Sequence, residues 1–172
     1  MISIADIILN SISIELVSIK KLCYPKNKKI YNKVRILDME ILIIDAQGGG
    51  IGKQLIIEIN KNFKDAHITA VGTNSVATTN MLKAGAKNAA TGENAVVVGC
   101  RKADIIIGPV GIVIADSMYG EITPKMAVAV GQSDAKKLLI PMNHCNNIIV
   151  GVENKRMNEF ISETINDLKS YL

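Results

Sequence analysis

The residues with the clearest chemistry form a glycine loop between an apolar segment and a helical pattern. The segment EILIID at residues 40–45 ends in Asp45, and two residues, Ala46 and Gln47, separate it from the loop. The loop consists of Gly48, Gly49, Gly50, Ile51, Gly52 and Lys53. Such a loop points backbone N–H groups and the positive end of a helix at an anion, and glycine leaves room for close approach. The sequence therefore predicts a site for a phosphate-bearing ligand, such as NAD(P) or another nucleotide.

Two known phosphate-binding patterns share part of this loop. Residues 45–52 (DAQGGGIG) resemble the TGxxxGIG fingerprint of short-chain dehydrogenases, but Thr73 and Asn74 stand where a dinucleotide site has an acid for the ribose. Residues 48–53 (GGGIGK) resemble the loop of deviant Walker ATPases, although Gln54 replaces the magnesium-binding hydroxyl. The loop thus indicates an anion and leaves its identity open.

Polar residues at the ends of two further predicted strands complete the expected crevice. They are Thr73, Asn74, Thr91 and Asn94. The carboxyl ends of parallel strands share one edge of a sheet, where ligands bind in open α/β folds. The alternative is that the turns use these residues for backbone reasons.

Three carboxylates near strand ends are candidates for acid–base catalysis. They are Asp45, Glu93 and Asp116. A carboxylate in a crevice can act as a general acid or base. Two of them also have a specific structural interpretation: Asp45 would cap its turn, and Glu93 would lie in the first turn of a helix N-capped by Thr91.

The order of apolar and amphipathic segments predicts a three-layer, Rossmann-like α/β domain over residues 39–172, with a mostly parallel sheet of 5–6 strands flanked by helices. Strands are expected at residues 40–45, 67–72, 87–90, 104–108, 137–141 and 147–152. Helices are expected at residues 51–62, 75–84, 93–102, 124–130 and 156–171. Thr123 and Pro124 should open the fourth helix, and Gly85 should end the second. An open, Ile-rich sheet edge would favour a homodimer.

The composition excludes several classes of protein. Hydrophobic residues make up 48% of the chain, enough for a core, and the absence of Trp leaves no aromatic platform for nucleic acid. The formal charge is +4, but the basic excess lies in residues 1–38, so we expect no nucleic-acid partner. Three cysteines without a CxxC pair predict neither a disulfide framework nor a metal site, and they fit a cytoplasmic protein.

Residues 1–38 form an N-terminal extension with a different composition. All 13 glycines come at or after Gly48, while Ile, Lys, Asn and Tyr dominate the extension. One interpretation is an upstream AT-rich stretch read in frame, with the true start at Met39; N-terminal mass spectrometry showing a mature start at Met1 would contradict it. The alternatives are a packed amphipathic helix or a membrane anchor. Asp6 and Glu15 disfavour the anchor, since each would cost about 2.5 to 3.5 kcal/mol in a membrane helix.

Several segments outside the loop resemble one bacterial family. The segments are GTNSVATTNMLKAGA (72–86), ATGENAVVV (90–98), ADIIIGPVGIVIADSMYGEITP (103–124) and SDAKKLLIPMN (133–143). They are similar to an uncharacterised, domain-of-unknown-function family of short, mainly clostridial proteins that share a GGGIGK loop. The resemblance implies a start at the position of Met39 and supplies no activity.

Three functions fit these observations. The first is nucleotide or dinucleotide binding without assigned catalysis. The second is an enzyme, namely a hydrolase, lyase or racemase, that acts on a small anionic metabolite through the candidate carboxylates. The third is a non-catalytic interaction module. For the first two, the expected partner is a small anionic ligand, and we expect no role at a membrane.

Overall fold

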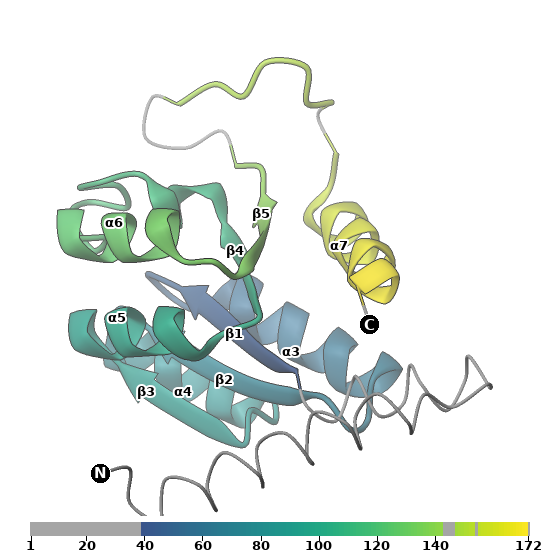
Figure 1. Ribbon diagram of the computed structural model, residues 1–172. Helices are drawn as coiled ribbons and strands as arrows, with labels where there is room; N and C mark the ends of the chain where they lie inside the picture. The colour runs from purple at the N-terminus through teal and green to yellow at the C-terminus, as the bar shows by residue number, and fades with distance from the viewer. Residues whose placement is uncertain (1–38, 143–146, 154, 172) are drawn as a thin grey trace, which may run out of the picture. The chain divides into compact units, whose positions relative to one another are not determined.

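The computed structural model describes residues 39–142, 147–153 and 155–171. The extension at residues 1–38, and the interpretations given for it, lie outside these residues. One parallel sheet of five strands forms the centre of the described domain (Figure 1). The strands are β1 (Glu40–Asp45), β2 (His67–Gly72), β3 (Asn88–Thr91), β4 (Ile105–Pro109) and β5 (Lys136–Ile140).

The strand order is β3-β2-β1-β4-β5, and all neighbouring strands run parallel. The chain therefore builds outward from β1 in one direction and then, with β4, in the other. The register pairs Asp45 with Gly72 and Gly72 with Thr91, so the carboxyl ends of β1, β2 and β3 are level. This arrangement confirms the predicted Rossmann-like α/β fold.

Strand β1 is buried on both faces, which explains its unbroken apolar sequence. Ile41 and Ile43 belong to one core cluster, and Leu42 and Ile44 belong to another on the opposite face. Alternating side chains of a strand point to opposite faces, so each cluster needs its own cover of helices.

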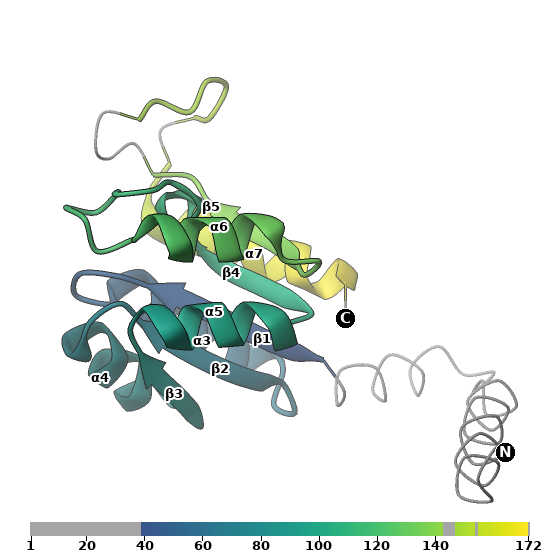
Figure 2. The same ribbon diagram turned by 60° about the vertical axis from the view of Figure 1, so that its left-hand side comes forward.

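Five α-helices supply that cover. Helices α3 (Gly50–Asn62), α4 (Ser75–Lys83) and α7 (Met157–Tyr171) pack on the face with Ile41 and Ile43. Helices α5 (Glu93–Lys102) and α6 (Pro124–Gln132) pack on the other face, with the short 3₁₀ helix η1 (Val110–Val113). Figure 2 shows α5 and α6 in front of the sheet and α3 and α7 behind it.

The predicted helix ends are mostly confirmed. The Thr123 hydroxyl accepts a hydrogen bond from the Met126 amide at 3.2 Å, and Pro124 opens α6. Gly85 has a φ of 101° just after α4, as expected of a glycine that ends a helix. The predicted cap of α5 is wrong, because Gly92 is its N-cap and Thr91 is the last residue of β3.

The predicted strand at residues 147–152 is wrong. The segment contains a turn and no strand, and Ile148 and Val150 are 83% and 92% exposed. A short apolar run does not by itself distinguish a strand from a loop. The Ile-rich strands β1 and β4 are central, and the edge strands among the described residues are β3 and β5, so these residues form no open, Ile-rich edge of the kind predicted. The homodimer itself stays a prediction.

Two identical substitutions should separate the core from this segment. Ile107→Ala in β4 removes a side chain with no exposed surface and should lower the free energy of unfolding by about 2 to 5 kcal/mol. Ile148→Ala should change it by less than about 0.5 kcal/mol. Denaturant unfolding of both variants checks this, and a large loss from Ile148→Ala would contradict the exposed placement.

Candidate functional site

The glycine loop joins β1 to α3 by a tight turn. The Gly49 amide donates to the Ala46 carbonyl at 3.0 Å, and Gly49 is the N-cap of α3 with a φ of 66°. Gln47 also has a positive φ of 52°. The N-cap residue is a glycine and has no side chain to bond the amides of the first turn; among these amides, Asp45 accepts from that of Gly52.

The glycines of the loop have two different roles. A Cβ at Gly49 would lie 2.7 Å from the backbone of Ala77, and a Cβ at Gly52 would lie 2.5 Å from Sδ of Met81. These two glycines let α3 and α4 pack closely. A Cβ at Gly48 or Gly50 would meet no atom within 4 Å.

The amides of Gly48 and Gly50 are available to a ligand. Within residues 39–142, 147–153 and 155–171, nothing accepts a hydrogen bond from either amide. Both glycines are exposed and face open space. Donors at the start of a helix, with no side chain above them, are suited to an anion.

The Asp45 side chain holds the loop by accepting hydrogen bonds from backbone amides. Its Oδ1 accepts from the Ala46 amide at 2.8 Å, and its Oδ2 accepts from the Gly52 amide at 2.7 Å. Burial raises the pKa of Asp45 above its ordinary value, although these backbone hydrogen bonds oppose the shift. The capping role considered for Asp45 is what the geometry shows, and Asp45 also faces a cavity described below.

The side chain of Glu121, a residue that the sequence analysis did not identify, lies against the residues that follow β2. Its Oε2 accepts from the Gln47 amide at 2.8 Å, from Nδ2 of Asn74 at 2.8 Å and from the Thr73 hydroxyl. Burial raises the pKa of Glu121, but the three hydrogen bonds outweigh it, so the net pKa is lowered. The ionised carboxylate thus joins the glycine loop to the second strand end.

The predicted binding residues Thr73 and Asn74 therefore lie beside the glycine loop, in contact with Glu121. Besides binding Glu121, Nδ2 of Asn74 donates to the Gln47 carbonyl at 2.9 Å, and Oδ1 of Asn74 caps α4. Asn80 donates to the Gly48 carbonyl at 2.8 Å. Amide side chains thus hold the carbonyls of Gln47 and Gly48, while the amides of Gly48 and Gly50 have no acceptor among the described residues.

Glu121 comes from the loop between η1 and α6, which has an uncommon backbone. Asp116, Met118 and Tyr119 have φ values between 55° and 59°, and Gly120 has a φ of 83°. Residues other than glycine seldom adopt such angles and cost about 1 to 3 kcal/mol each when they do. Strain of this kind is concentrated at functional sites in proteins.

A cavity of about 700 Å³ lies where the strand order reverses, between the ends of β1 and β4. It is lined by Asp45, Ala46, Gln47, Ile51, Pro109, Val110, Gly111, Ile114, Asp116, Ser117, Met118, Tyr119, Met142 and Asn147. Its size is typical of small-molecule sites, and its lining combines apolar side chains with a few polar groups. None of these lining residues is Lys or Arg.

Other predicted residues are held elsewhere. The Thr91 hydroxyl lies 2.7 Å from that of Thr78, in contact with α4. Glu93 accepts from the Thr123 hydroxyl at 2.8 Å and pairs with Lys125 at 3.0 Å. The hydrogen bond from Thr123, together with Lys125, lowers the pKa of Glu93. Glu93 therefore ties α5 to α6 and does not line the cavity.

Two predicted binding residues have weaker support. Lys53 and Asn94 are exposed, and neither lines the cavity at the strand ends. Lys53 lies in the first turn of α3, close to the loop in sequence. Asn94 lies in the first turn of α5.

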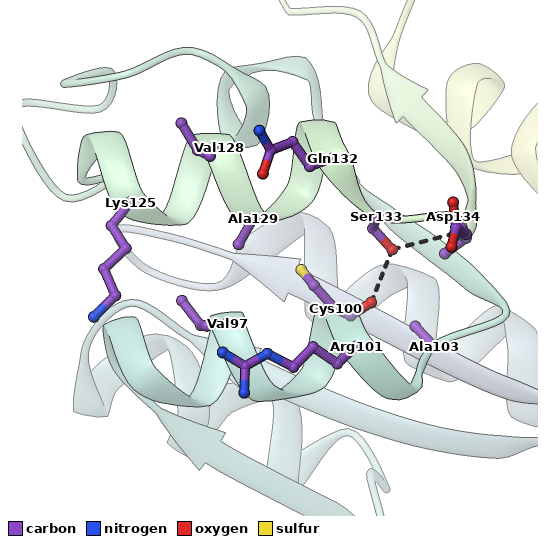
Figure 3. Close-up of a pocket in the computed structure, with 11 residues that line it drawn as sticks. Val97, Cys100, Arg101, Ala103, Lys125, Val128, Ala129, Gln132, Ser133 and Asp134 are labelled. Atoms are coloured by element: carbon purple, nitrogen blue, oxygen red, sulfur yellow. Dashed lines mark hydrogen bonds between the residues drawn. The ribbon is translucent and has the colours of Figure 1, made fainter.

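A second hollow, of about 490 Å³, lies between α5 and α6 (Figure 3). Cys100 lies in its wall, and the Ser133 hydroxyl donates to the Cys100 carbonyl at 2.8 Å. Burial raises the pKa of the Cys100 thiol to about 11, so the thiol is protonated at neutral pH. This hollow shares no lining residue with the cavity at the strand ends.

The described part of the chain contains neither a cluster of metal-ligating side chains nor a helix that could cross a membrane. There, His, Cys, Asp and Glu side chains do not gather in threes as metal ligands would. The helices of the same residues are too short or too polar to cross a membrane.

The fold and the site define a Rossmann-like α/β protein with its crevice at the carboxyl ends of the strands. Residues 40–172 match the family described as "Domain of unknown function (DUF3842)", and the chain belongs to this family. No curated protein matches the chain. Among solved structures, it is similar to a dodecameric FMN-dependent UbiX-like decarboxylase from Escherichia coli O157:H7, with 15% identity, a TM-score of 0.41, and coverage of 77% of this chain and 75% of that one.

Glu121→Gln should make the free energy of unfolding fall less steeply as the pH is lowered. The lowered pKa of Glu121 means that its ionised form favours folding. This contribution is present above the ordinary glutamate pKa of about 4.3 and is lost as pH falls through the lowered value in the folded protein. Denaturant unfolding of both chains across acidic pH measures the difference. Equal losses in the two chains would contradict the hydrogen bonding described for Glu121.

Proposed function

We propose that the protein binds a nucleotide or dinucleotide at the carboxyl ends of its strands, with the phosphates over Gly48 and Gly50. The observation that carries the proposal is a pair of open, unbonded loop amides at the start of α3, directly beside a cavity of small-molecule size. We assign no reaction to this binding. A cytoplasmic location stays a prediction.

The geometry supports phosphate binding through backbone groups. Helix α3 has 13 residues, long enough for the positive end of its dipole to act on an anion. A Cβ at Gly48 or Gly50 would meet no atom within 4 Å, so the backbone of both residues is open to close approach. The residues present thus fit a phosphate group that approaches the backbone closely.

The charges favour a ligand with few phosphates. The cavity lining contains two carboxylates, Asp45 and Asp116, and no Lys or Arg. Glu121 adds a further negative charge beside the loop; burial raises the pKa of Asp45, and the charge of Glu121 adds to this rise. Backbone dipoles and Lys53 in the first turn of α3 would have to balance the charge of the ligand, so one pyrophosphate, as in NAD(P), fits better than a triphosphate.

Gly50→Ala should weaken nucleotide binding by about tenfold or more without harming the fold, because its methyl group takes the space of the phosphate. Alanine is also favoured over glycine in a helix, so stability should stay equal or rise by up to about 1 kcal/mol. Calorimetric titration of the full chain with NAD, NADP, ATP, GTP, FAD and sugar phosphates measures binding.

Gly131→Ala is the matched control for this substitution. Gly131 lies in α6, and a Cβ there also meets no atom within 4 Å, so this variant should bind as the unmodified chain does. Absence of binding by the unmodified chain at millimolar concentrations of every ligand would refute the proposal. Equal weakening by both variants would show that Gly50 has no special role.

A second candidate function is catalysis on a small anionic metabolite. The observation that favours it is that two of the three candidate carboxylates, Asp45 and Asp116, line one cavity with Ser117. Burial raises the pKa of Asp45, and carboxylates with raised pKa values recur in active sites. Glu93 has no part in this proposal, because Thr123 and Lys125 hold it.

Asp116→Asn tests the catalytic candidate. Asparagine tolerates the φ of 59° at this position, so the fold should be retained. We expect turnover of a metabolite pool by the unmodified chain and a loss of about a hundredfold or more in the variant. Mass spectrometry of the pool measures this, and no change in any metabolite would reject catalysis.

A further inference from the structure

NAD-binding sites of this topology have an acid near the end of the second strand, whereas NADP-binding sites can have an arginine nearby. The acid accepts hydrogen bonds from the ribose hydroxyls of the ligand. Here β2 ends at Gly72 and is followed by Thr73, Asn74 and Ser75, none of which is an acid. In this respect the sequence alone argues against a ribose site.

The structure brings an acid to this place from a distant loop. The Glu121 carboxylate accepts from Thr73 and Asn74, which follow β2, and from the amide of Gln47 in the turn before the glycines. It therefore lies between the second strand end and the start of the glycine loop. We infer that Glu121 is the ribose-recognising residue of the crevice, and that the ligand carries a free 2′,3′-diol.

The hydrogen bonds of Glu121 leave one oxygen open. All three bonds within the described residues go to Oε2, and none goes to Oε1. The donors are an amide, a side-chain amide and a hydroxyl, so no described cation neutralises the charge. An oriented carboxylate with an open oxygen is suited to accept hydrogen bonds from hydroxyl groups.

The neighbouring backbone gives independent support. Asp116, Met118 and Tyr119, just before Glu121, all have positive φ values. A loop whose only task was to join η1 to α6 would not need three such residues. The same loop forms a wall of the cavity through Asp116, Ser117, Met118 and Tyr119, so one strained segment serves both the cavity and the carboxylate.

The chemistry of this carboxylate sets a specificity. A free diol donates hydrogen bonds to Oε1, whereas a 2′-phosphate brings a second negative charge against it and has no hydroxyl to donate. The inference rests on the proposed nucleotide binding and narrows it. The protein should select NAD-type ligands over NADP-type ligands and over 2′-deoxy analogues.

The test is calorimetric titration of the full chain with NAD, NADP and the 2′-deoxy form of NAD. We expect NAD to bind at least about tenfold more tightly than either of the others. This series needs no variant, so it does not depend on how a variant folds. Binding of nucleotides without this preference would overturn the inference and leave the proposed function standing, while binding of no nucleotide would overturn both.

Two variants then assign the preference to the residue. Glu121→Gln removes the negative charge. In this variant the affinity for NAD should exceed the affinity for NADP by about threefold or less. Thr73→Val removes one donor to Glu121 and keeps the charge, so it should weaken both ligands and preserve the ratio. An unchanged ratio in Glu121→Gln would overturn the inference. Tighter binding of both ligands by Glu121→Gln would also overturn it, because Glu121 would then be an internal anion that competes with the ligand.

Discussion

The site depends on the hydrogen bonds of one buried carboxylate. Asp45 is 4% exposed, and burial of a charge is costly unless its oxygens are bonded. Its two oxygens accept from the amides on either side of the glycine turn, which fixes the turn against the end of β1. The fixed turn orients the Gln47 amide toward Glu121, and Glu121 in turn holds the loop that forms a wall of the cavity. The walls of the crevice are thus held in place by a series of hydrogen bonds that begins at Asp45.

Features determined by neighbouring residues were predictable from the sequence. The apolar strands, the helix after Thr123 and the glycine turn after Asp45 all follow from local patterns, and the structure has them. The segment at residues 147–152 has the same apolar character but is exposed, because pairing with a sheet is a property of the whole fold. No local pattern distinguishes the two cases.

The contacts of Glu121 could not be predicted from local sequence patterns either, because they also depend on the whole fold. Its partners Gln47 and Asn74 are separated from it by 74 and 47 positions, and the loop between η1 and α6 has no motif. Positive φ angles at Asp116, Met118 and Tyr119 are seen only in the structure. Glycine in a sequence suggests such an angle, whereas these three residue types do not. The topology of the sheet was enough to predict where the cavity lies. The charges of the side chains that line it could not be predicted in this way.

The two edges of the sheet have a consequence for how copies of the chain meet. Strand β3 has only four residues, and β5 carries Lys136 and Lys137, with the Lys136 ammonium 5.1 Å from the centre of the Tyr171 ring of α7. Short strands and lysines discourage the addition of a foreign strand, so neither edge is suited to continue the sheet into another molecule. Contacts between copies of the described domain are therefore better suited to its helices and loops, where surface side chains rather than backbone hydrogen bonds decide the partner.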